Sequence, residues 1–161
     1  MSGLLIKGGR IVDPATSLDS LRDLRLRAGA IAEIGERLEA SGDEEILDAA
    51  HAVVAPGFVD MHVHLREPGF PEKETIATGT QAAVRGGFAT VACMPNTQPA
   101  LDDPAVIGWL MREVAVHARC RVYPIAAITR GRQGAQPCDF PALAQAGAVA
   151  FPMTAIPSKM P

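Results

Sequence analysis

The first 56 residues carry short runs of apolar residues, separated by glycines and charged side chains. These runs lie at residues 4–11, 24–26, 30–34, 45–48 and 52–54. Apolar runs of this length, bounded by turn-forming residues, are typical of short β-strands. The pattern predicts a small β-sandwich segment over residues 1–56, which ends at Pro56-Gly57.

From residue 57 the pattern alternates between strand-like and helix-like stretches. A buried strand is expected over Phe58–His64, and further strands at 89–94, 122–128 and 148–151. Helices are expected between them at 74–85, 103–119 and 139–146, the second opened by an acidic cap. Strands that alternate with helices indicate a parallel sheet with right-handed crossovers.

A doubly wound sheet and a barrel share this alternation. No G-x-G-x-x-G follows the first strand, and polar residues gather after the strands' C-terminal ends, which favours the barrel. A closed (β/α)8 barrel takes about 250 residues, so residues 57–151 hold about half of one. The predicted fold class is α/β: a partial (β/α)8 TIM barrel preceded by the β-sandwich segment.

The composition argues against several kinds of binding partner. Hydrophobic residues make up 48% of the chain and charged residues 20%, with a net charge of −3. The basic residues are scattered, so neither nucleic acid nor an acidic membrane is an expected partner. No run of eighteen apolar residues occurs, and the three cysteines form no C-x-x-C pair. Reduced thiols and a cytoplasmic location are therefore expected.

The sharpest chemical pattern is the histidine pair His62 and His64 at the end of the first barrel strand. Side chains alternate along a strand, so both imidazoles should point into the barrel, while Met61, Val63 and Leu65 should pack outward against helices. Two inward imidazoles suit Zn²⁺, although a catalytic zinc takes about three protein ligands. A hydrogen-bonded pair of histidines in a polar barrel mouth is the alternative.

The surrounding residues decide between these alternatives through a family resemblance. Residues 56–69 read PGFVDMHVHLREPG, and Met94-Pro95-Asn96-Thr97 follows the second barrel strand. Both stretches resemble the motifs of dihydroorotases, members of the cyclic amidohydrolase superfamily, whose barrels are of the metal-dependent amidohydrolase type. The resemblance covers Leu4 to Phe151, as the N-terminal portion of such an enzyme.

The resemblance implies a zinc hydrolase that interconverts dihydroorotate and N-carbamoyl-L-aspartate in pyrimidine biosynthesis. It implies His62 and His64 as zinc ligands, and Arg66 and Asn96 as ligands of the substrate carboxylate. Asp60 is expected as a supporting carboxylate behind the ligands or as an anchor of the backbone.

Two of these residues have simpler alternative roles. In that case Arg66 would only pair with Glu67 or face solvent, and Asn96 would only form a turn after Pro95. His51 and His117 belong to no family motif and are assigned no role.

Residues 152–161 depart from the family pattern. Dihydroorotases continue after the fourth strand with a stretch like Phe-Ser-Asp-Asp-Gly, whereas this chain reads FPMTAIPSKMP from Phe151, so the family carboxylate expected near Met153 is absent. Deleting one base from the serine codon of a family-like coding sequence reproduces this reading. We interpret 152–161 as an aberrant, frameshifted tail. A chain that ends there should retain no catalytic residue and be inactive.

The sequence is also consistent with other functions. Hydantoinases and allantoinases share the histidine pair, so another cyclic amide is an alternative substrate. A second alternative is a non-catalytic, dihydroorotase-like subunit associated with aspartate transcarbamoylase, and a third is a non-functional fragment. A homo-oligomer is compatible with all of them.

Overall fold

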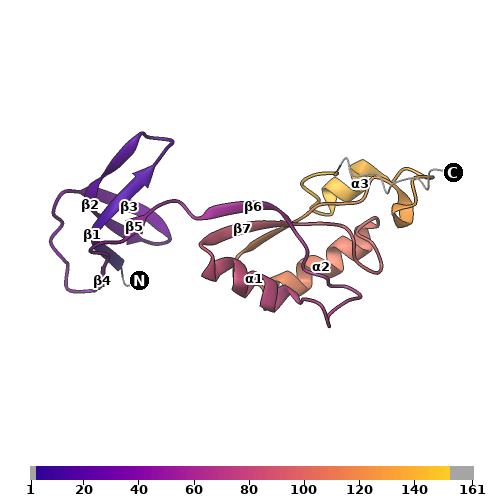
Figure 1. Cartoon of the computed structure of the whole chain (residues 1–161), viewed down its shortest axis with the longest axis horizontal. Coiled ribbons are helices and arrows are strands. Elements are labelled where there is room, and N and C mark those ends of the chain that lie inside the picture. The colour runs from indigo at the N-terminus through magenta and orange to yellow at the C-terminus, as the bar shows by residue number, and fades with distance from the viewer. Residues whose placement is uncertain (1–2, 153–161) are drawn as a thin grey trace. The chain divides into compact units, whose positions relative to one another are not determined.

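A computed structural model describes residues 3–152, and its contacts divide the chain into two compact units, 1–56 and 57–161. Figure 1 shows an N-terminal unit built from strands and a second unit in which strands and helices alternate. Each unit has its own core. The tail beyond Pro152, and with it the position of Met153, lies outside the described residues.

The N-terminal unit is one sheet of five strands. They are β1 (Gly3–Asp13), β2 (Leu18–Arg27), β3 (Ala30–Gly35), β4 (Glu44–Asp48) and β5 (Val53–Val54). The order is β3-β2-β1-β4, with β5 also paired to β1. The first three strands pair antiparallel, whereas β4 and β5 run parallel to β1. All five predicted strands are present, but within residues 3–56 they form this single sheet and not the predicted β-sandwich.

A buried carboxylate helps to hold this sheet. The register of β1 and β2 shifts between Ile6 and Gly9, where Gly8 adopts a φ of 72°. The Gly8 amide donates to Asp23 Oδ1 at 2.8 Å, and the Leu38 amide donates to Asp23 Oδ2 at 2.9 Å. Buried polar groups need such partners, so Asp23 ties the irregular part of β1 to the segment after β3.

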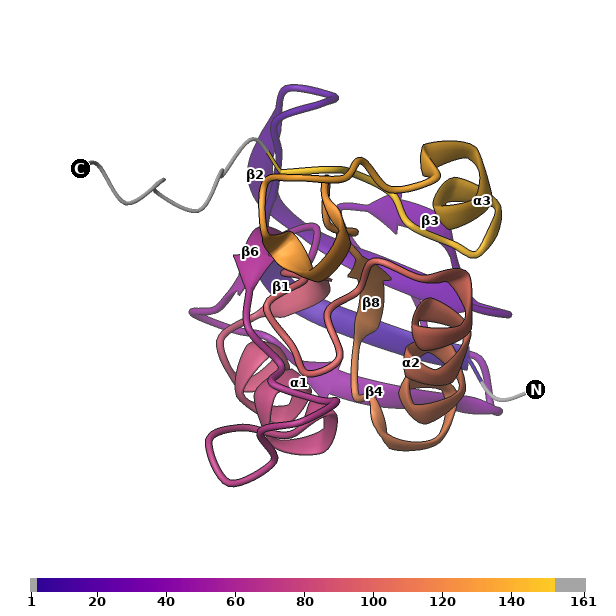
Figure 2. The same cartoon turned by 90° about the vertical axis from the view of Figure 1, so that its right-hand side faces the viewer.

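The second unit is a parallel sheet with helical crossovers. Its strands are β6 (Phe58–Val63), β7 (Phe88–Cys93) and β8 (Arg121–Pro124), in the order β6-β7-β8. Its helices are α1 (Ile76–Arg85), α2 (Pro104–His117) and α3 (Phe140–Gln145), with a 3-10 turn, η1, at Arg130–Arg132. Figure 1 shows α1 and α2 along the same face of the sheet, and Figure 2 shows α3 near α2, which it contacts. The predicted α/β alternation is present.

The core of this unit lies between the sheet and its helices. It includes Val91, Val122, Ile76, Ile107 and Leu110, none of them more than 4% exposed. Each α-helix begins one residue after a side-chain cap: Thr75, Asp103 or Asp139 accepts a hydrogen bond from a backbone amide of the first turn. Such caps satisfy amides that have no partner inside the helix.

Two strand predictions are wrong in part. Strand β6 is predicted to be buried, yet Phe58, Val59 and Met61 are 58%, 60% and 76% exposed. Within residues 3–152 only β7 pairs with β6, so one side of the strand has no neighbour. The strand expected at 148–151 is reduced to a single parallel bridge between Ile125 and Ala150.

None of the helices in residues 3–152 has the length and apolar character needed to cross a membrane.

Candidate active site

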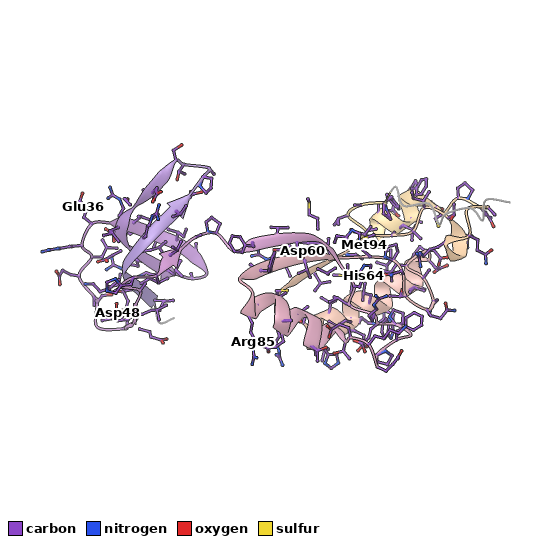
Figure 3. The ribbon with its side chains drawn as sticks, viewed as in Figure 1. Glu36, Asp48, Asp60, His64, Arg85 and Met94 are labelled. Carbon is purple, nitrogen blue, oxygen red and sulfur yellow. The ribbon has the colours of Figure 1, made fainter. Side chains whose placement is uncertain are left out.

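The candidate site lies where β6 and β7 end. Val63 pairs with Cys93 in the last register position, and the Met94 amide donates to the Val63 carbonyl oxygen at 2.9 Å. Parallel strands bring their C-terminal ends to one edge of the sheet. Figure 3 accordingly shows His64 close to Met94, with Arg85 at the other end of the sheet.

His62 and His64 lie close together at this edge. Their ring centres are 5.2 Å apart, with an angle of 72° between the ring planes. His62 is exposed, whereas His64 is half-buried. One imidazole is therefore open to solvent while the other is held by its surroundings.

The residue that holds His64 comes from the second loop. Nδ1 of His64 lies 2.7 Å from Oδ1 of Asn96, within hydrogen-bond distance. A carboxamide oxygen only accepts, so Nδ1 must carry the proton in this pair. The contact joins residues 32 positions apart in sequence.

Asp60 supports the strand from inside β6. Its Oδ1 accepts a hydrogen bond from the His62 amide at 3.0 Å, where the register of β6 and β7 shifts between Asp60 and Val63. This irregularity breaks the strict alternation assumed from sequence. Leu65 is buried and Val63 packs against the core, as predicted, but Met61 does not pack against helices.

Arg66 follows in an unusual backbone conformation. Its φ is +62°, in the left-handed region that residues other than glycine seldom adopt. In the described part of the chain, none of the ion pairs involves Arg66. Strained backbone is often found at functional positions. The half-buried Arg66 side chain is therefore available for an anion from outside these residues.

Glu67 does not pair with Arg66, which removes one of the plainer roles of that arginine. The Oε2 of Glu67 instead accepts a hydrogen bond from the Ile76 amide at 2.7 Å, at the first residue of α1. A carboxylate at a helix N-terminus is favoured by the helix dipole. The loop after β6 is thus tied to the start of the next helix.

The two loops also pack directly on each other. The Gln98 amide donates to the Pro68 carbonyl oxygen at 2.9 Å. Gly69 has a φ of +105°, and a β-carbon on it would collide with the Gln98 carbonyl oxygen. This close approach fixes the spacing between the loop that bears Arg66 and the loop that bears Asn96.

The histidine pair fits a shared metal ion. Two imidazoles on one tetrahedral zinc, with bonds of about 2.0–2.1 Å, have ring centres about 5 Å apart, close to the observed 5.2 Å. No third histidine, cysteine or acidic side chain joins them to form a three-ligand cluster among residues 3–152. Burial raises the pKa of the nearby Cys93 thiol to about 12, so it stays protonated within the core.

Sequence patterns indicated the individual residues but not their contacts. The His64–Asn96 pair and the hydrogen bond from the start of α1 to Glu67 have no local signal, because the partners are separated by 32 and 9 positions. The one available signal is that both the histidine and the asparagine follow strand ends.

Comparisons with known proteins agree with this architecture. The solved structure of an L-hydantoinase (dihydropyrimidinase) from Arthrobacter aurescens matches with a TM-score of 0.78 at 21% identity, over 94% of this chain and 32% of that one. A D-hydantoinase (dihydropyrimidinase) from Thermus sp. matches with a TM-score of 0.62 at 32% identity, over 78% and 28% of the two chains. The fold places the protein among the cyclic amidohydrolases, a class of hydrolases.

Sequence comparison narrows the class to one family. Residues 51–157 match the family described as Dihydro-orotase-like. A dihydroorotase of Geotalea daltonii is 46% identical over 147 residues, which are 91% of this chain and 35% of the relative. One of Pelotomaculum thermopropionicum is 49% identical over 148 residues, 92% and 34% of the two. The chain belongs to the dihydroorotase-like family and spans about a third of the length of these relatives.

Proposed function

We propose that the chain is the N-terminal part of a zinc-dependent dihydroorotase, which interconverts dihydroorotate and N-carbamoyl-L-aspartate in pyrimidine biosynthesis. The observation that carries this proposal is the pair His62 and His64, whose ring centres lie 5.2 Å apart at the C-terminal end of a parallel strand. In (β/α)8 barrels the active site lies at that end of the strands. Residues 57–151 would supply the first half of such a barrel.

His62 and His64 would be two of the zinc ligands, with Asp60 supporting the first of them through the His62 backbone amide. Bound zinc polarises a carbonyl group and activates water for hydrolysis. Arg66 would bind the substrate carboxylate through its planar guanidinium group, which matches a carboxylate with two parallel hydrogen bonds. The Asn96 amide would add a third hydrogen bond to that carboxylate.

The 161-residue chain alone would be inactive. Catalytic zinc takes about three protein ligands, and residues 3–152 supply two that lie together. We propose that the tail 152–161 is frameshifted. Sequencing the gene tests this: an intact reading frame through these codons would contradict it.

The first experiment is the intact mass of the native gene product, with zinc content and dihydroorotate hydrolysis measured on the same sample. A longer product with bound zinc and hydrolytic activity would support the proposal. An inactive, zinc-free product that co-purifies with aspartate transcarbamoylase would favour the non-catalytic subunit instead. A substrate panel that includes hydantoin and allantoin separates the related activities, which the hydantoinase-like fold keeps relevant.

Arg66 gives a test of substrate binding in an active product. Replacing Arg66 with Lys removes the bidentate hydrogen bonding to the carboxylate but keeps the positive charge. Hydrogen bonds to charged groups contribute about 1.5–3 kcal/mol, so KM for dihydroorotate should rise about 10-fold to 100-fold. Arg85→Lys, in the last turn of α1, is the matched control and should leave KM unchanged. An unchanged KM in the Arg66 variant would exclude the carboxylate role.

A further inference from the structure

The side-chain carboxamide of Asn96 contacts His64, which the proposed function uses as a metal ligand. Nδ1 of His64 and Oδ1 of Asn96 are 2.7 Å apart, and both side chains are half-buried. His62 makes no such side-chain contact within residues 3–152, where its hydrogen bond to Asp60 is made by its backbone amide. The two histidines of the pair are therefore held differently.

This hydrogen bond selects one tautomer of His64. A neutral imidazole carries its proton on one nitrogen, and the partner of that nitrogen decides which one. The Oδ1 oxygen can only accept, so the proton belongs on Nδ1 and the lone pair of Nε2 is left free. A metal cation binds through such an unprotonated nitrogen.

The backbone keeps the partner in place. Cys93 pairs with Val63, and the Met94 amide donates to the Val63 carbonyl oxygen at 2.9 Å, so the two loops leave the sheet side by side. The buried Thr97 donates from Oγ1 to the Pro99 carbonyl oxygen at 2.7 Å, which fixes the turn just after Asn96. Asn96 is therefore oriented by its own loop and not only by His64.

We propose that Asn96 is a positioning residue that holds His64 as the Nδ1-protonated tautomer and presents its Nε2 to a cation. Among residues 3–152 the Nδ2 group of the same carboxamide has no acceptor, so it would be able to donate to an anion next to that cation. One side chain would thus link the metal ligand to the substrate carboxylate. This inference rests on the proposed function for the identity of the cation, but not for the tautomer.

The tautomer is measured directly by nitrogen-15 NMR of the imidazole rings in the metal-free 161-residue chain at alkaline pH. His64 should show a protonated Nδ1 and an unprotonated Nε2. His51 and His117, both exposed, serve as internal references in the same spectrum. His64→Gln assigns the resonance.

Three variants separate the role of Asn96 from a general effect on folding. Asn96→Ala removes the acceptor and should shift His64 toward the Nε2-protonated form. Asn96→Asp retains an acceptor oxygen and should keep the wild-type tautomer. Gln98→Ala removes the exposed side-chain carboxamide of another residue in the same loop, keeps the backbone amide, and should change nothing at His64. The circular dichroism spectrum of each variant checks that the fold is retained.

Zinc titration of the same samples gives the second readout. Loss of a residue that orients a metal ligand typically weakens metal binding about 10-fold to 100-fold, so Asn96→Ala should show a loss of that size, whereas Asn96→Asp should bind zinc within about threefold of wild type. A wild-type His64 with its proton on Nε2, or an Asn96→Ala variant with an unchanged tautomer, would overturn the proposal. The NMR result decides the role of Asn96 by itself, because residues 3–152 of the chain supply only two of the roughly three ligands that a catalytic zinc takes.

Discussion

At the scale of single residues, some side chains of the site have a hydrogen-bonding partner in the chain and one has no ionic partner among the described residues. Glu67 is satisfied by the Ile76 amide and His64 by Asn96, whereas the Arg66 guanidinium makes no ion pair within residues 3–152. Under the proposed function, this guanidinium would be the group that binds the anionic substrate. The residues that already have partners stabilise the loops, whereas the residue without one would be able to bind a ligand.

Glu44 in the N-terminal unit should make the free energy of unfolding depend on pH. Hydrogen bonds from the Ser41 amide and from Arg27 and Arg25 lower the pKa of Glu44 to about 2, from 4.5. A lowered pKa in the folded state contributes stability at neutral pH that is lost as the pH falls from about 4.5 to about 2. Glu44→Gln should therefore lower the free energy of unfolding at pH 7 and flatten its dependence on pH in that window.

Urea unfolding of both proteins at a series of pH values measures this effect. Glu45→Gln is the matched control, because Glu45 is an exposed neighbour on the same strand and forms no ion pair in the described part of the chain. If the Glu44 and Glu45 variants behaved alike, the ionic cluster would not be a source of stability.

At the scale of elements, the site depends on two loops that touch. Gly69 lets the loop after β6 approach the Gln98 carbonyl group of the loop after β7, and the Gln98 amide bonds back to the Pro68 carbonyl oxygen at 2.9 Å. Because Arg66 and Asn96 lie on these loops, any separation of the loops would separate the proposed carboxylate ligands as well.

Gly69→Ala tests this contact. The variant combines backbone strain at a φ of +105° with a collision against Gln98, and should lose about 2–4 kcal/mol of unfolding free energy. The amide NMR signals of residues 66–70 and 96–99 should shift with it. Gly147→Ala is the control, since Gly147 has a φ of +114° but a β-carbon added there would meet no atom within 4 Å. Equal losses in both variants would assign the whole effect to backbone strain.

At the scale of the whole molecule, the second unit leaves one side of strand β6 without a neighbouring strand. Within residues 3–152, β6 pairs only with β7, and its apolar residues Val59 and Met61 are 60% and 76% exposed. Unpaired strand edges and exposed apolar side chains both promote association between chains. The 161-residue chain by itself should therefore self-associate.

Met61→Lys should reduce that association several-fold, as measured by sedimentation velocity over a range of concentrations. A charge on an edge strand opposes pairing with another chain. Val116→Lys is the control: Val116 is 72% exposed but lies on helix α2, which has no strand edge to pair. An equal effect of both substitutions would point to surface hydrophobicity alone, and no effect of the Met61 change would exclude β6 as the contact.

What the sequence determined by itself is the order and type of the elements and the position of the histidine pair. Alternating runs of apolar residues, caps such as Asp103 and the H-x-H at a strand end are properties of neighbouring residues, so they can be recognised without a structure. The helices begin and end within two residues of the predicted positions.

The tertiary structure decided which of those residues meet. Met61 is exposed on a strand that has β7 as its one neighbour within residues 3–152, and the expected fourth strand is reduced to a single bridge at Ala150. The contact of His64 with Asn96 and that of Gly69 with Gln98 depend on the pairing of β6 with β7 and on the paths of two loops. Such contacts join distant parts of the chain, so only the packing of the whole second unit brings them together.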